Sequence, residues 1–163
     1  MTGLPWLFID MDGVVNRQVS DEVAICNRIQ LAVDNRGPIG HRSFWFNPAD
    51  RELLHRAQAD FRLAWATWRD DAEDLLNQWF GLDLRAVDFY LSKDYDSKVP
   101  GLWRRAGSAP FVWLDDDVTS ADEHFLSLTD VPHLVIRVDP EVGLTSDHFD
   151  EARSWAQEVS WST

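Results

Sequence analysis

Seven residues have side chains that can bind metal ions or phosphate: Asp10, Asp12, Thr67, Lys98, Asp115, Asp116 and Asp117. Lys98 precedes a short apolar segment, and the others lie at or just after the end of one. Carboxylates gathered at one place raise each other's pKa unless a cation balances their charge. Mg²⁺ suits a site of a few carboxylates plus a substrate phosphate. A hydroxyl and an ammonium suit a phosphoryl group, and an aspartate can act as the nucleophile and form an aspartyl-phosphate. These residue types therefore predict Mg²⁺-dependent phosphoryl transfer.

This chemistry requires that residues far apart in the sequence meet in the fold. Residues 4–10, 61–67 and 111–114 are short apolar runs, each suited to a strand that is buried on both faces. In open α/β sheets, ligands bind at the carboxyl ends of the strands. We therefore expect the polar residues that end these runs to converge on one edge of a parallel sheet.

The remaining pattern alternates strands and helices, which predicts a three-layer, Rossmann-like α/β fold with helices on both faces of a parallel sheet. Further strands are expected at residues 86–91 and 134–138. Helices are expected at about residues 71–80, 97–106 and 146–159. Two more helices are expected from their caps: one begins at Asn47 and Pro48, and the other at a capping box of Ser120 and Glu123.

Residues 14–47 are the least regular part of the sequence. Residues 29–33 and 43–46 are expected to form a β-hairpin around the turn-rich residues 34–40. Ordinary packing of this hairpin is the favoured interpretation of its aromatic and basic residues, and a substrate-facing wall is the alternative. Those residues are His41, Arg42, Phe44, Trp45 and Phe46.

The sequence FIDMDGVV at residues 8–15 resembles the first motif of the haloacid dehalogenase (HAD) superfamily, an apolar strand that ends in DxDG. Thr67 at the end of a strand resembles the second motif, and Lys98 resembles the third. The sequence VWLDD at residues 112–116 resembles the fourth, a strand that ends in paired acids. The four motifs occur in the family's order, and the resemblance extends over about residues 4–140.

The resemblance implies a HAD-like fold and a role for each matching residue. Asp10 attacks phosphorus, while Asp12 protonates the leaving oxygen and then activates water. An aspartate at the position of Asp12 is the phosphatase-type feature of the superfamily. Thr67 and Lys98 hold the transferring phosphoryl oxygens. The implied Mg²⁺ ligands are Asp10, the backbone carbonyl of Asp12, and Asp115 or Asp116.

Three assignments stay open at this point. The consecutive acids leave the choice among Asp115, Asp116 and Asp117 unresolved. Lys93 competes with Lys98 for the third motif, and we favour Lys98 because it lies next to a helix start. Arg69 is a candidate for substrate contact, although a surface arginine at the entry of a helix is the favoured interpretation.

We expect one HAD-like domain over residues 1–163, in which residues 14–47 form a flap and hairpin in place of a large cap domain. Such an open site admits bulky substrates or relies on a second copy of the chain to close it. The only cysteine is Cys26, so no disulfide is expected within the chain. No long apolar segment or signal peptide is recognisable, so we expect a cytoplasmic protein with no membrane partner.

The expected function is a Mg²⁺-dependent phosphatase that acts on a small phosphorylated metabolite or a nucleotide. A polynucleotide end phosphatase is the main rival: an open site favours it, but a net charge of −13 disfavours nucleic-acid binding. A phosphorylatable receiver domain ranks lower, because its phosphorylated aspartate ends a middle strand and the threonine and lysine follow it. A non-catalytic regulatory domain also ranks low, because every motif position carries a competent side chain.

Overall fold

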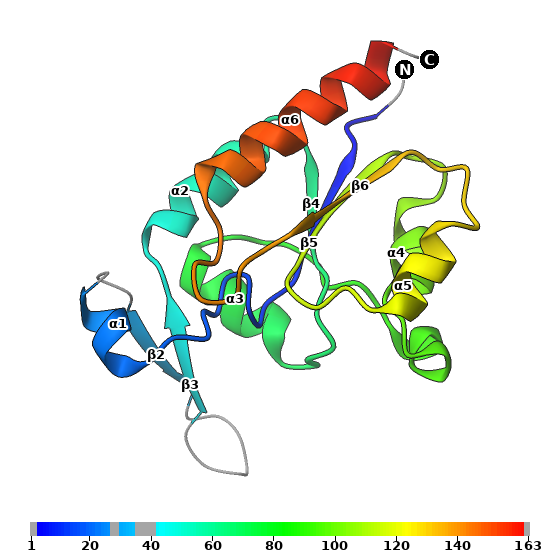
Figure 1. The fold of residues 1–163 in the computed structure, drawn as a ribbon. Coiled ribbons are helices and arrows are strands. Elements are labelled where there is room, and N and C mark those ends of the chain that lie inside the picture. Colours follow the sequence, from blue (N-terminus) through cyan, green and yellow to red (C-terminus); the bar gives the residue numbers. More distant parts are fainter. Residues whose placement is uncertain (1–2, 27–29, 35–41, 162–163) are drawn as a thin grey trace.

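A four-stranded parallel sheet lies at the centre of the computed structural model, which describes residues 3–26, 30–34 and 42–161 (Figure 1). The strand order is β4-β1-β5-β6. The strands are β1 (Trp6–Ile9), β4 (Arg62–Trp65), β5 (Phe111–Asp115) and β6 (His133–Arg137). The parallel α/β architecture expected from the alternating pattern is thereby confirmed.

The register of the sheet decides which residues meet at its carboxyl edge. Ile9 at the end of β1 pairs with Trp65 of β4 on one side and with Leu114 of β5 on the other. The residues that follow Ile9, Trp65 and Leu114 therefore lie side by side at the carboxyl edge of the sheet. The backbone N–H of Asp10 continues the ladder by donating to the carbonyl of Leu114 at 3.0 Å.

Helices cover both faces of the sheet, because successive strand residues point to opposite sides. The helices are α2 (Ala49–Ala57), α3 (Ala72–Phe80), α4 (Val99–Ala106), α5 (Ser120–Leu126) and α6 (Ser146–Trp161). Leu7 and Ile9 pack in the core with α2, α3 and α6, whereas Phe8 packs with α4 and α5. Across the described part of the chain, no helix combines the length and the apolar character that a membrane crossing needs.

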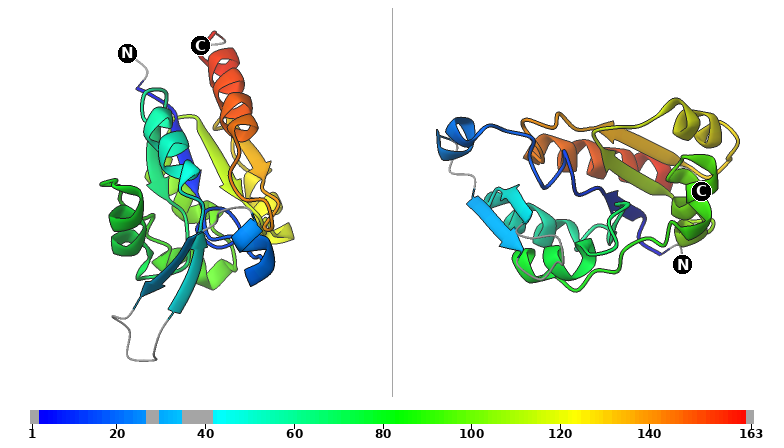
Figure 2. Two further views of the ribbon diagram at one scale, coloured as in Figure 1. Left: turned by 90° about the vertical axis from the view of Figure 1, so that its left-hand side faces the viewer. Right: turned by 90° about the horizontal axis from the view of Figure 1, so that it is seen from below.

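A β-hairpin follows the first strand, as the sequence predicts. Its strands are β2 (Gln30–Asp34) and β3 (Arg42–Phe46), and Figure 2 shows them projecting beyond the sheet. Phe44 and Phe46 are buried in the main core, which confirms ordinary packing for these two side chains. His41 and most of the expected turn lie outside the described residues. The helix α1 (Asp21–Cys26) was not expected, because six residues are too few to show a helical period.

The strand expected at residues 86–91 is wrong. Ala86 makes a single bridge to Trp65, and the chain then enters the 3₁₀ helix η1 (Tyr90–Tyr95). Val87 and Phe89 are both buried in the core beneath α4, so the apolar pattern that suggested a strand reflects this packing. The segment thus runs beside β4 without extending the sheet.

Two helix starts also differ from expectation. The capping box of α5 consists of Thr119 and Asp122 instead of Ser120 and Glu123, because the helix begins one residue earlier than the pattern suggested. Pro48 occupies the N-cap position of α2 instead of the first helical position. The helices expected to end at residues 80 and 106 do end there, because Gly81 is the C-cap of α3 and Gly107 that of α4.

Candidate active site

Asp10 lies at the carboxyl end of the central strand β1 and is buried. Its Oδ1 accepts a hydrogen bond from the backbone N–H of Met11 at 2.7 Å. Its Oδ2 lies 2.8 Å from Nζ of Lys98. Because both carboxylate oxygens have partners, the orientation of this side chain is well defined.

Lys98 is the buried cation of the site and occupies the N-cap position of α4. Its Nζ donates to Oδ2 of Asp115 at 2.6 Å and lies within ion-pair distance of Asp10. Burial opposes the charged ammonium, but the two carboxylates outweigh this effect and raise the pKa of Lys98 above its ordinary value. The lysine is therefore charged at neutral pH and bridges two strand ends.

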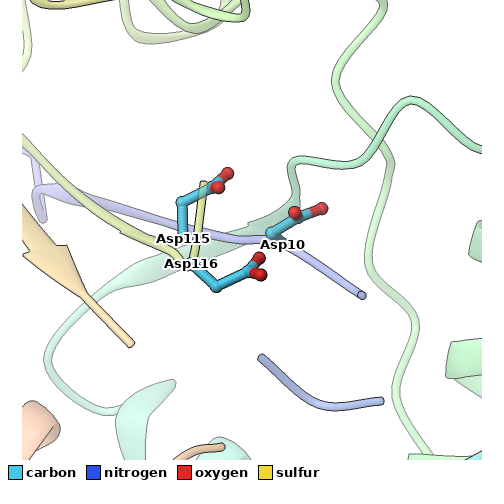
Figure 3. A group of neighbouring side chains, drawn as sticks. All are labelled: Asp10, Asp115 and Asp116. Atoms are coloured by element: carbon cyan, nitrogen blue, oxygen red, sulfur yellow. The ribbon is translucent and has the colours of Figure 1, made fainter. Parts of the chain in front are cut away.

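Three carboxylates come together beside this lysine. Ligand oxygens of Asp10, Asp115 and Asp116 all lie within 4.8 Å of one another (Figure 3). Asp115 is fully buried at the end of β5, and its Oδ1 accepts from the backbone N–H of Asp117 at 2.9 Å. The side chain of Asp117 is itself exposed and lies outside this cluster.

The electrostatics of the cluster show excess negative charge. Burial raises the pKa of Asp10 to about 7; Lys98 opposes this shift, and the neighbouring Asp115 adds to it. Burial and then Asp115 also raise the pKa of Asp116. Three carboxylates facing one ammonium leave two negative charges unbalanced, which is the charge that one divalent cation supplies.

Gly13 allows the loop after β1 to approach the acidic cluster closely. Its φ is +75°, a conformation that glycine adopts without strain. A Cβ built at this position would lie 2.1 Å from Cγ of Asp116. The glycine of the DxDG pattern therefore leaves the space that the Asp116 carboxylate occupies.

Asp12 lies on the same loop, but its carboxylate is outside the cluster of three. Its Oδ1 accepts from Nδ2 of Asn16 at 2.6 Å, and its Oδ2 lies 3.7 Å from Nη1 of Arg69. The side chain is 44% exposed, which leaves it accessible to a substrate and to water. This arrangement suits a group that exchanges protons more than one that is locked into a metal site.

The position of Arg69 differs from the favoured expectation of a surface arginine. Its guanidinium lies 5.0 Å from the centre of the Phe44 ring on the hairpin strand β3. The Nη1 atom of Arg69 approaches Asp12, and its Nε lies 3.4 Å from Oδ1 of Asp71. Arg69 thus connects the hairpin to the loop that carries Asp12.

These groups open into a cavity of about 400 Å³ at the carboxyl edge of the sheet. Thr67, which follows β4, is buried at its wall. The cavity brings together seven residues singled out in the sequence: Asp10, Asp12, Thr67, Arg69, Lys98, Asp116 and Asp117. The side chain of Lys93 lies outside the described residues.

Asp122 is a buried residue of the site region that the sequence analysis missed. Its Oδ1 accepts from Oγ of Ser97 at 2.7 Å and from the backbone N–H of Lys98 at 2.9 Å. Its Oδ2 accepts from both the backbone N–H and the hydroxyl of Thr119, at 2.9 and 2.8 Å. This carboxylate therefore fastens the start of α4, with its lysine, to the start of α5. The sequence signal for Asp122 was the T-x-x-D capping box at residues 119–122. The predicted capping box was placed one residue too late, at Ser120 and Glu123.

A second buried acid, Asp50, was also missed. Arg17 donates two hydrogen bonds to it, at 2.6 and 2.9 Å, and both side chains are buried. The same guanidinium donates to the carbonyls of Val142 and Leu144 after β6. One ion pair thus joins the loop after β1, the start of α2 and the loop before α6. No local sequence pattern links these segments.

Comparison with known proteins identifies the fold. No protein-family model matches the sequence, and no match is found among curated proteins. A variant of the fission yeast RNA polymerase II CTD phosphatase Fcp1 bound to beryllium fluoride aligns with 98% of this chain at 12% identity and a TM-score of 0.50. A further structure of Fcp1, an essential RNA polymerase II CTD phosphatase, aligns over 98% of this chain at 15% identity and a TM-score of 0.50.

The alignments cover 52% and 50% of the two Fcp1 chains, so the present chain spans about half the length of the structures it matches. At these identities the likeness concerns the fold. The chain has the HAD-like α/β fold of these phosphatases, as the first motif at residues 8–15 led us to expect.

Proposed function

We propose that the chain is a Mg²⁺-dependent phosphomonoester hydrolase that works through an aspartyl-phosphate on Asp10. The observation that carries the proposal is the meeting of Asp10, Asp115 and Asp116 beside Lys98 at the carboxyl edge of the sheet. The HAD-like fold shared with two phosphatase structures supports it. Small phosphorylated metabolites or nucleotides are the proposed substrates.

The residues of the cluster suit Mg²⁺. Hard oxygen ligands from three carboxylates lie within 4.8 Å of one another, and their excess charge over Lys98 matches a divalent ion. In this proposal Asp10, Asp115 and Asp116 hold the ion, together with the backbone carbonyl of Asp12. Bound Mg²⁺ neutralises the charge of the substrate phosphate and of the nearby carboxylates.

Asp10 is the proposed nucleophile. One of its carboxylate oxygens forms a bond to phosphorus as the bond between phosphorus and the leaving oxygen breaks. Lys98 keeps the Asp10 carboxylate in place before the reaction and remains close to the phosphoryl oxygens during it. Thr67, buried at the cavity wall, offers a hydroxyl donor to the same oxygens.

Asp12 is the proposed general acid and base. In the first step it donates a proton to the leaving oxygen, which departs as an alcohol. In the second step its carboxylate takes a proton from water, whose oxygen attacks phosphorus and releases phosphate from Asp10. The exposure of Asp12 and its hydrogen bond to Asn16 support this role, because the carboxyl is accessible yet oriented.

The proposal is tested by hydrolysis of p-nitrophenyl phosphate with and without Mg²⁺. We expect activity with Mg²⁺, none in excess EDTA, and none for Asp10→Asn, which removes the nucleophile but keeps the size of the side chain. Asp83→Asn is a matched control, because Asp83 is exposed and lies outside the cavity. Full activity in EDTA, or an active Asp10→Asn enzyme, would contradict the proposal.

A further inference from the structure

A second cavity of about 470 Å³ adjoins the one that contains Asp10. The two cavities share Thr67, Trp68 and Arg69 in their walls. Ligand sites in proteins commonly occupy roughly 300–1,000 Å³, so the second cavity has the size of a binding site. A substrate whose phosphate lies beside Asp10 can therefore extend past Thr67 into this second space.

Trp68 is the most distinctive residue of the shared wall. Its side chain is 38% exposed, although large aromatic side chains usually gain by being buried. The ring is supported from behind by Phe89, with 4.9 Å between the ring centres. Trp68 is thus held in place by Phe89 and lines both cavities, which suits stacking against a flat ligand.

Charged side chains of both signs surround the second cavity, which suits an uncharged polar group such as a nucleoside. Glu73 and Asp88 both lie in its wall, together with Asp70. Glu73 accepts hydrogen bonds from Arg85 and from the backbone N–H of Ala86, and Asp88 forms an ion pair with Arg104. Arg69 lies in the same wall, so the charges largely balance, and the carboxylate oxygens can accept hydrogen bonds from amino and hydroxyl groups of a ligand.

We infer that this second cavity is the leaving-group subsite, that it takes the nucleoside of a mononucleotide, and that Trp68 stacks against the base. The inference rests on the proposed function, because it assigns a leaving group to that reaction. Arg69 gives the direction: it lies 3.7 Å from Asp12, the proposed proton donor to the leaving oxygen, and lines both cavities. We therefore place the leaving group between Asp12, which protonates its oxygen as the bond to phosphorus breaks, and Trp68.

The test compares adenosine 5′-monophosphate with ribose 5-phosphate, which carries a hydroxyl group where the nucleotide carries its base. Stacking of a base on an aromatic side chain corresponds to roughly a tenfold to hundredfold effect on binding. We expect the wild-type kcat/KM to favour the nucleotide by about that factor, mainly through KM. Trp68→Ala should lose this preference, and Trp68→Phe should keep most of it. Tyr95→Ala should keep it fully, because Tyr95 is 56% exposed and lines neither cavity.

Failure of the inference is distinguishable from failure of the proposed function. An active wild type without preference for the nucleotide, or a Trp68→Ala enzyme with unchanged preference, overturns the inference alone. A wild type that hydrolyses p-nitrophenyl phosphate but neither of these substrates also overturns the inference alone. A wild type that hydrolyses none of the three with Mg²⁺ contradicts the proposed function. In that case saturation-transfer NMR with adenosine still decides the inference: binding that Trp68→Ala abolishes supports it, and absence of binding overturns it.

A third substrate, a 5′-phosphorylated oligonucleotide, separates a mononucleotide from the end of a nucleic acid. We expect the mononucleotide to be the better substrate, because the chain carries a net charge of −13, which disfavours binding of a polyanion. A clear preference for the oligonucleotide that weakens with added salt would overturn the mononucleotide assignment and favour a polynucleotide end phosphatase.

Discussion

The ammonium of Lys98 lies 2.8 Å from Oδ2 of Asp10, and the same nitrogen donates to Asp115 at 2.6 Å. One buried cation therefore connects the ends of two neighbouring strands. This arrangement keeps two carboxylates close together despite their mutual repulsion. In the proposed mechanism it also places a positive charge beside the transferring phosphoryl group.

Replacing this lysine should sharply reduce turnover. Lys98→Met keeps the aliphatic stem but removes the charge that orients Asp10. We expect kcat on p-nitrophenyl phosphate to fall by about 10²–10³, the usual effect of losing one donor to a developing charge. Steady-state kinetics on the folded variant, checked by circular dichroism, measures this.

Lys93→Met is the matched control for Lys98→Met, because these are the only two lysines in the chain. We expect it to keep the wild-type kcat. A large loss in Lys93→Met together with a small loss in Lys98→Met would show that the third motif had been assigned to the wrong lysine.

Gly13→Ala should damage the site more than the fold. The added Cβ would lie 2.1 Å from Cγ of Asp116, so the carboxylate must move out of the cluster. We expect weaker Mg²⁺ binding, measured by isothermal titration calorimetry, and a lower kcat. Gly107→Ala is the comparison: its φ of +64° is similarly left-handed, but nothing lies within 4 Å of the added carbon. Equal loss of Mg²⁺ affinity in both variants would show that backbone strain alone is responsible.

Asp122→Asn tests the attachment of Lys98 to the rest of the site. The asparagine side chain keeps one acceptor oxygen, but an NH₂ group replaces the other oxygen. This NH₂ group would face N–H and O–H groups that donate to the Asp122 carboxylate in the wild type. We expect kcat to fall about tenfold while KM changes little, because Asp122 positions Lys98 and does not touch substrate. Thr119→Ala removes only the capping half of the network, and should lower kcat less. Similar kcat values for both variants, at a temperature where both are folded, would contradict this role.

The buried pair of Arg17 and Asp50 predicts a pH dependence of stability. Burial raises the pKa of Asp50 from 3.8 to about 6, although Arg17 opposes the shift. The folded protein therefore binds this proton more tightly than the unfolded chain does. This tighter proton binding by Asp50 stabilises the folded protein fully below about pH 4. The stabilisation is lost as the pH rises through about 6.

Asp50→Asn removes this titration. Urea unfolding of wild type and variant across that pH range should show the wild type losing stability relative to the variant as the pH rises. Asp10 titrates in both proteins, so its effect cancels in the comparison. A difference in unfolding free energy that stays constant with pH would mean that folding does not raise the pKa of Asp50.

The positions of Asp10, Asp115 and Asp116 were predictable because each follows an apolar strand, and parallel strands bring such residues to one edge. The chemical roles of these residues stay predictions. By contrast, residues 86–91 have the alternating apolar pattern of a β-strand but do not form one. Alternate residues of this segment are buried because they pack in the core, and a β-strand would produce the same pattern. Only the three-dimensional neighbours distinguish these two causes.

Contacts between single residues far apart in the sequence were not predictable. Nothing near Arg17 indicates that it binds Asp50, because the pairing depends on how two loops and a helix pack together. Arg69 was assigned to the surface because it lies at the entry of a helix, whereas the hairpin brings Phe44 beneath it. Asp122 had a local signal, but a shift of one residue in the capping box concealed it.

The most direct test of the account is to trap the phosphoryl group on Asp10. A brief reaction with p-nitrophenyl phosphate and Mg²⁺ is quenched with borohydride, which reduces an acyl phosphate to an alcohol. Peptide mass spectrometry then locates the reduced residue. The account predicts homoserine at position 10 in the wild type, dependent on both substrate and Mg²⁺. Reduction at another carboxylate, or steady turnover with no reduced residue at position 10, would contradict it.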